Sequence, residues 1–228
     1  MKYLILLIAV FTVLAACTNN NNEWEILFNG NNVDKLRGYK MDSFPYDAWE
    51  VTNGTISTKT DVQNVDIVTK KVYKDFELNF EWKISKAGNS GVFHHVQEIA
   101  DQEAGNGNSP NWLNDFEMQI LDDIDFHDNA PVRSAGSLYD LIAPTNKKLK
   151  PVGEYNTAKL IVKGNRVEHW LNGTKVLEYE NESDGLNNLL SKSKFKDNPD
   201  YGKTKPGHIM FQHHGQKVWF KNIKIKEL

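Results

Sequence analysis

The sequence contains one cysteine, Cys17, in 228 residues, and this scarcity excludes a disulfide framework. Basic and acidic residues nearly balance, with a formal net charge of −3, so the chain lacks the excess positive charge that attracts nucleic acid. Beyond the N-terminal segment, no apolar run approaches the roughly 20 residues of a membrane-spanning helix. We therefore expect a fold stabilised by a large apolar core, and no nucleic-acid partner.

The N-terminal segment has the pattern of an export signal. A lysine at position 2 precedes an apolar run over residues 3–13, and small residues precede Cys17. The sequence Leu-Ala-Ala-Cys is typical of a lipobox, whose cysteine is lipidated, although an ordinary signal peptide with an incidental cysteine is the alternative. We expect residues 1–16 to be removed, residues 17–23 to form the lipidated cysteine and a polar tether, and residues 24–228 to form one domain. The protein would then be exported to the periplasm or outer membrane and would contact the membrane only through this lipid anchor.

Strand patterns dominate the rest of the chain. Residues 75–84 alternate between apolar and polar, and residues 160–179 predict a three-stranded meander with two-residue turns. Residues 208–213 and 217–226 predict a final hairpin, and the expected helix covers residues 184–192. Shorter strands are expected at 26–28, 49–51, 55–58, 67–69 and 91–96. The pattern predicts an all-β, single-domain β-sandwich of the jelly-roll kind.

One long segment breaks the strand pattern. Residues 102–111 are rich in glycine, asparagine and serine. Loops of this length often form the rim of a functional site. An ordinary surface connection is the alternative.

The segment from Phe116 to Asp122 combines an apolar strand pattern with polar side chains. Strand alternation places Glu117 and Gln119 on one face, and a kink near the strand end would bring Asp122 to the same face. Two carboxyl groups about 5 to 5.5 Å apart are what a retaining glycosidase needs. A solvated strand face is the alternative. We interpret the segment as one wall of a sugar-binding cleft.

Histidines and aromatic residues supply candidates for the facing wall. His169 and His214 are the candidate bases, although His169 shares a face with apolar residues and would otherwise be a core histidine. Substrate binding is expected from Gln119, Gln212, Tyr139, His95, His127 and Trp170. The sequence requires no cofactor, and a divalent metal held by histidine and aspartate is an open alternative.

A series of motifs in a specific order gives the chain a family resemblance. They are Leu27–Gly30, Gly88–Val92, Glu117–Asp122, Ala135–Asp140, Gly153–Asn156, His169–Gly173, Phe211–Gly215 and Val218–Ile223. With them the chain resembles the bacterial 3-keto-disaccharide hydrolase domain family. The resemblance implies a concanavalin-like, laminarinase-like jelly roll that acts on glycosides already oxidised to a ketone at sugar carbon 3.

Such a ketone would make the glycosidic bond cleavable by elimination. It acidifies the hydrogen on carbon 2, so a base can remove that proton, the substituent on carbon 1 leaves, and water adds back. On this hypothesis the base is His169 or His214, and the acid or orienting carboxylate is Glu117 or Asp122. Gln119, Gln212 and Tyr139 would bind hydroxyl groups or the oxyanion.

Two other functions fit the same residues. A conventional retaining glycosidase would use Glu117 and Asp122 directly on unoxidised glycans. A non-catalytic carbohydrate-binding lipoprotein would bind sugar without turnover, because jelly rolls serve both enzymes and lectins. The glutamine at position 119 and the abundance of histidine favour the ketosugar enzyme.

Overall fold

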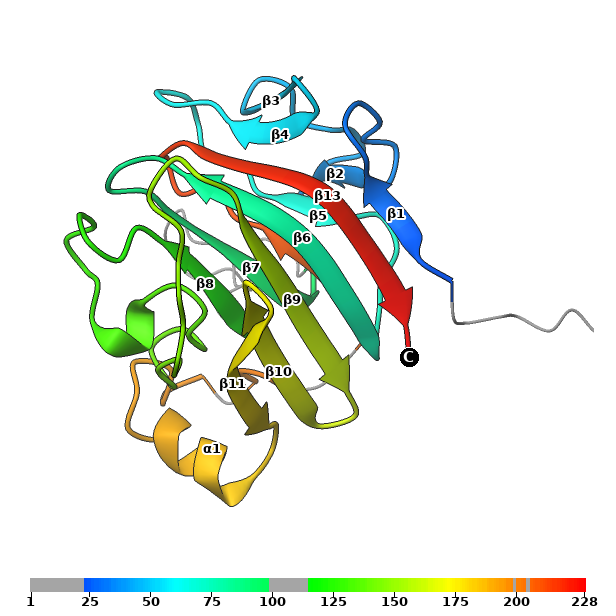
Figure 1. Cartoon of the computed structure of the whole chain (residues 1–228). Coiled ribbons are helices and arrows are strands. Elements are labelled where there is room, and N and C mark those ends of the chain that lie inside the picture. The colour runs from blue at the N-terminus through cyan, green and yellow to red at the C-terminus, as the bar shows by residue number, and fades with distance from the viewer. Residues whose placement is uncertain (1–22, 99–114, 199, 204–205) are drawn as a thin grey trace, which may run out of the picture.

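The computed structural model describes residues 23–98, 115–198, 200–203 and 206–228. Two antiparallel sheets pack face to face in one domain (Figure 1). This confirms the all-β jelly-roll sandwich predicted from the sequence. Cys17 and the loop expected at 102–111 lie outside the described residues. In the described part of the chain, no helix has the length and apolarity to cross a membrane.

The larger sheet has eight strands. In spatial order they are β11 (Thr174–Glu180), β10 (Arg166–Leu171), β9 (Asn156–Lys163), β6 (Phe76–Ile84), β13 (Val218–Glu227), β4 (Thr55–Thr58) and β3 (Trp49–Thr52), with β1 (Glu25–Phe28) paired to β13. The smaller sheet has five strands. Their order is β2 (Leu36–Gly38), β5 (Ile67–Thr69), β12 (His208–Phe211), β7 (Asn89–Val96) and β8 (Glu117–Leu121).

The core lies between the sheets because strand alternation turns the apolar residues inward. In β6 every second residue is buried, from Phe76 through Trp82 to Ile84, while the residues between them are half-exposed on the outer face. Burial of each large apolar side chain contributes roughly 1.5–3 kcal/mol. The sandwich is therefore stabilised by its inner faces, and the outer faces are left for other uses.

Local turn and cap chemistry agrees with the sequence prediction. The meander of β9, β10 and β11 is present, and Asn172 and Gly173 have the positive φ angles, 47° and 79°, that a type I′ turn requires. Helix α1 (Asp184–Leu190) begins after Ser183, whose Oγ accepts a hydrogen bond from the Leu186 N–H at 3.2 Å. The helix ends two residues before the predicted boundary.

The predicted final hairpin is wrong. β12 lies between β5 and β7 in the small sheet, whereas β13 lies between β6 and β4 in the large sheet. The segment between them crosses from one sheet to the other, and Thr58 Oγ1 donates to the Gln216 carbonyl at 2.8 Å on the way. Apolar alternation indicates which face of a strand is buried but not which sheet the strand joins, so it does not distinguish a hairpin from a crossing between sheets.

Candidate active site

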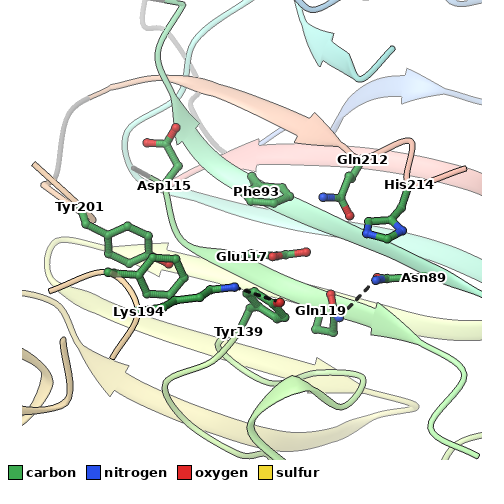
Figure 2. A pocket seen from close by; sticks show the side chains of 11 residues that line it. Asn89, Phe93, Asp115, Glu117, Gln119, Tyr139, Lys194, Tyr201, Gln212 and His214 are labelled. Carbon is green, nitrogen blue, oxygen red and sulfur yellow. Dashed lines mark hydrogen bonds between the residues drawn. The ribbon is translucent and has the colours of Figure 1, made fainter. Parts of the chain in front are cut away.

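A pocket lies on the outer face of the small sheet. Alternation in β8 places Met118 and Ile120 in the core and turns Glu117 and Gln119 outward. The pocket has a volume of about 170 Å³ (Figure 2). It is lined by Asn89, Phe93, Asp115, Glu117, Gln119, Tyr139, Lys194, Phe195, Tyr201, Gln212 and His214.

The Glu117 carboxyl is at the centre of the pocket (Figure 2) and lies across β7 above Gly91. A Cβ atom on Gly91 would lie 1.9 Å from Glu117 Oε1, so only glycine leaves room for this side chain. Glu117 is 5% exposed, and burial raises the pKa of its carboxyl to about 8; Lys194 opposes the rise and Asp66 adds to it. The group therefore carries a proton at neutral pH.

Two glutamines flank this carboxyl with unsatisfied oxygens. Gln119 Oε1 and Gln212 Oε1 are buried without a hydrogen-bond partner among the described residues. The amide of Gln119 makes one long bond, from Nε2 to Asn89 Oδ1 at 3.4 Å. An unsatisfied buried polar atom costs about 1–3 kcal/mol, so such atoms normally meet a ligand or water. Their position suits a ligand rich in hydroxyl groups.

A cation and a phenol form one side of the rim. Lys194 Nζ donates a hydrogen bond to Tyr139 Oη at 3.0 Å and lies 4.1 Å from the centre of the Tyr139 ring. The Tyr139 N–H donates to the Glu117 carbonyl at 3.1 Å, which fixes the phenol beside β8. His214 is exposed at the other side, and its Nδ1 is 3.0 Å from Gln216 Oε1. The rim thus adds the positive charge of Lys194, the Tyr139 phenol and the His214 imidazole to the protonated carboxyl of Glu117.

The structure brings five of the predicted site residues into this one pocket. They are Glu117, Gln119, Tyr139, Gln212 and His214. The neutral acid, the amide acceptors and the imidazole are the groups that sugar binding and proton transfer require.

Comparison with known proteins decides the family. The model of the 3-keto-alpha-glucoside-1,2-lyase-like domain matches residues 23–226. The chain belongs to this family. A protein named 3-keto-disaccharide hydrolase from Bacteroides thetaiotaomicron is 34% identical over 226 residues, which cover 89% of this chain and 77% of that protein.

Solved structures agree with this assignment. The crystal structure of a putative glycosyl hydrolase from Parabacteroides distasonis superposes with a TM-score of 0.80 at 32% identity, covering 90% of this chain and 94% of that one. A carbohydrate-binding module from Bacillus subtilis superposes with a TM-score of 0.53 at 11% identity, covering 88% of this chain and 97% of that one. The second likeness shows the fold alone.

In this member of the 3-keto-alpha-glucoside-1,2-lyase-like family, Asp122 lies away from the pocket. Its carboxylate accepts hydrogen bonds from the N–H groups of Ala87 at 2.8 Å and Ile124 at 3.0 Å, so it stabilises the turn after β8. It follows the end of β8 and lines a separate hollow with Trp82 and Ile84 of β6. The predicted pairing of Glu117 with Asp122 across one cleft is wrong.

His169 also lies elsewhere than predicted. It is fully buried on the inner face of β10, and its ring Nδ1 donates to the Gly136 carbonyl at 3.0 Å. Burial lowers the pKa of the imidazole to about 4, so it is neutral at physiological pH. It does not line the pocket, because its face is the one that β10 packs into the core. His169 is therefore placed as the alternative interpretation expects, as a buried histidine of the core.

The other three predicted substrate-binding residues do not line the pocket either. His95 is buried, with Nε2 2.8 Å from the Lys74 carbonyl. Trp170 lies on the outer face of the large sheet and donates from Nε1 to Glu168 Oε2 at 2.8 Å. His127 is exposed, and its ring packs at 4.6 Å on that of Phe126, a neighbour of His214. Of these three, only His127 lies near the site, just outside its rim.

Sequence reasoning missed several lining residues. They are Asn89, Phe93, Asp115, Lys194, Phe195 and Tyr201. Asn89 and Phe93 share a face with Gly91 in β7, so strand alternation is the signal that identifies them. The last three come from the irregular segment after α1, where no periodicity marks a face. In the described part of the chain, no group of three or more His, Cys, Asp or Glu side chains is arranged to hold a metal ion.

Proposed function

We propose that this protein cleaves glycosides whose sugar carries a ketone at carbon 3, by proton abstraction, elimination and rehydration. The observation that carries the proposal is the protonated, buried Glu117 between two amide oxygens that have no partner in the described chain. Membership of the 3-keto-alpha-glucoside-1,2-lyase-like family supports the substrate class.

The first step removes the proton on carbon 2. With His169 in the core, His214 is the histidine that lines the pocket, and we assign it as the base. Its ring is oriented by the contact between Nδ1 and Gln216 Oε1 at 3.0 Å. The electron pair of the broken bond moves to the ketone oxygen and forms an enolate.

The enolate oxygen needs hydrogen-bond donors and positive charge. Tyr139 and Lys194 supply both, since the lysine ammonium contacts the phenol oxygen at 3.0 Å and leaves the phenol proton free to point at the oxyanion. Gln119 and Gln212 would accept hydrogen bonds from sugar hydroxyls, which would satisfy their buried oxygens.

Glu117 completes the cycle as a general acid and then a base. Its proton passes to the leaving oxygen on carbon 1 as that bond breaks. The resulting carboxylate then takes a proton from water, whose hydroxyl adds to carbon 1, while protonated His214 returns its proton to carbon 2. The net reaction is hydrolysis, and both residues end in their starting states.

The decisive experiment compares matched glucosides with and without the ketone at carbon 3. We expect cleavage of the oxidised substrate only, with products identified by NMR and mass spectrometry. Cleavage of the plain β-glucoside would instead support a retaining glycosidase, and affinity without turnover would support a carbohydrate-binding protein. Parallel reactions with chelator and with added divalent metal test the metal alternative.

We also propose that the protein is an exported lipoprotein anchored through Cys17. The export pattern over residues 1–16 and the lipobox support this localisation. Metabolic labelling with a radioactive fatty acid should mark the wild type and not the Cys17→Ser variant. Equal labelling of the two would contradict the anchor.

A further inference from the structure

A second acidic residue lies on the same outer face as Glu117. In the small sheet, Val68 pairs with Met210, so continuing the antiparallel register places Asp66 opposite Gln212. Val68 and Met210 pack together in an apolar cluster with Phe93, which also lines the pocket. Since alternate residues of a strand share a face, Asp66 faces the same side of the sheet as Gln212 and the pocket.

The Glu117 side chain extends toward this acid. Glu117 belongs to β8, yet its carboxyl lies above Gly91 of β7. On the far side of Gly91, the Gln212 N–H donates to the Gly91 carbonyl at 2.9 Å, which joins the end of β12 to β7. Asp66 is on the next segment beyond Gln212. Across the sheet, the order is Glu117, Gly91, Gln212 and Asp66. Because Gly91 has no side chain, nothing from β7 separates the Glu117 carboxyl from Gln212 and Asp66.

Asp66 is held in a fixed position. Its Oδ1 accepts a hydrogen bond from the His213 N–H at 2.7 Å, where the ladder between β5 and β12 has ended. Its own carbonyl accepts from the Tyr39 N–H at 2.8 Å. Burial raises the pKa of this carboxyl to about 7, and the bond from His213 limits the rise. Two carboxyls with raised pKa values, the buried Glu117 and the half-buried Asp66, therefore lie on one face of the sheet.

We propose that Asp66 is a positioning residue for the acid–base chemistry of the pocket, whose negative charge keeps the proton on Glu117. The two carboxyls interact electrostatically, and Lys194 acts on Glu117 in the opposite sense. The other titratable groups that line the pocket are Asp115, Tyr139, Tyr201 and His214. Asp66 would thereby extend to higher pH the range in which Glu117 can donate a proton. Only this catalytic consequence rests on the proposed function.

The test is an NMR titration of the carboxyl carbons in the ¹³C-labelled protein. Asp66→Asn removes the charge and keeps an oxygen that can accept from the His213 N–H. We expect the titration midpoint of Glu117 to fall by about 0.5 to 1 pH unit, because a like charge nearby disfavours ionisation. Asp75→Asn is the matched control, since Asp75 also accepts a backbone N–H, that of Gly164 at 2.9 Å, but does not line the pocket. It should leave the Glu117 midpoint unchanged.

The same variants separate the two proposals. If turnover of a 3-keto-glucoside is present, the high-pH limb of its rate profile should move down with the Glu117 midpoint in Asp66→Asn. A shifted midpoint without turnover would refute the proposed function and leave this inference standing. An unchanged midpoint would overturn the inference, whatever the activity. Should Asp66→Asn fail to fold, Asp66→Ser removes the same charge and tests the same coupling through the Glu117 midpoint.

Discussion

The outer faces of the two sheets both carry polar side chains but differ in how those side chains are paired. On the large sheet, Glu77 contacts Lys159 at 3.6 Å and Lys226 at 3.4 Å, and the acids there already have partners within the chain. On the small sheet, Gln119 and Gln212 have buried oxygens without partners in the described chain. The large sheet also has the larger hollow, about 590 Å³ against about 170 Å³. Unsatisfied polar atoms, rather than volume, therefore make the pocket on the small sheet the better candidate for a ligand site.

The largest effect that would test this contrast is loss of the central acid. Glu117→Gln keeps the shape of the neutral carboxyl and removes its transferable proton. We expect kcat/KM on a 3-keto-glucoside to fall by about 10² to 10⁴-fold, as is typical for general acids and bases. The thermal melting curve at pH 7 should change little, since a neutral amide replaces a neutral acid. Retention of full activity would remove Glu117 from the mechanism.

Gly91→Ala tests whether the bare backbone of β7 is needed. The added methyl group would lie 1.9 Å from Glu117 Oε1, so the carboxyl must move. We expect about a 10²-fold loss of kcat/KM from misplacement and a destabilisation of about 1–3 kcal/mol in urea unfolding. Gly185→Ala is the control, because only Ser183 Oγ lies near its added methyl group, at 3.9 Å. It should leave activity intact and slightly stabilise helix α1.

The protonated carboxyl also predicts how stability depends on pH. The folded-state pKa of Glu117 is about 8, above its ordinary value of 4.5, so the folded protein holds this proton more tightly than the unfolded chain. Its contribution is fully present below pH 4.5 and is lost as the pH rises toward 8. In urea unfolding over this range, the wild type should lose stability relative to Glu117→Gln. Parallel curves for the two proteins would contradict a raised pKa.

Gln212→Leu tests the unsatisfied amide. Removing a buried oxygen without a partner should leave the free energy of unfolding unchanged or raise it by up to about 1 kcal/mol. Substrate binding should weaken, with KM rising about tenfold and kcat less affected. A stability loss above this range, with KM unchanged, would mean that the amide serves the fold and not the ligand.

The smallest effect is expected on the large sheet. Glu77→Gln breaks ion pairs with Lys159 and Lys226 on a partly exposed surface. Such pairs contribute about 0–1 kcal/mol, so melting should shift by a few degrees at most, and kcat/KM should not change. A clear loss of activity would show that the contrast between the two faces is not one of function.

Local patterns predicted the parts of the fold that local physics determines. The alternation of β6 and the Asn172–Gly173 turn depend only on neighbouring residues, so the sequence was sufficient for both. The sheet joined by β12 depends on pairing with β5 and β7, far away in the chain. That pairing leaves no local signature, and a short connection to β13 favoured the wrong hairpin.

The residues of the candidate site show the same contrast between local patterns and long-range packing. Glu117 and Gln119 were found because alternation within one strand places them together. Asp122 follows the end of that strand, where alternation no longer applies, and its carboxylate bonds the backbone of Ala87 and Ile124 instead. Lys194 reaches the pocket from an irregular segment, and its position depends on tertiary packing that no short pattern encodes.

The position of β12 and β13 has a consequence for the order of folding. Each is inserted between strands that come earlier in the chain: β12 separates β5 from β7, and β13 separates β4 from β6. Until residues 208–227 have been synthesised and added, both sheets are divided and the core has open seams. Such long-range pairing slows folding, and fragments that end before β12 would expose unpaired strand edges and aggregate.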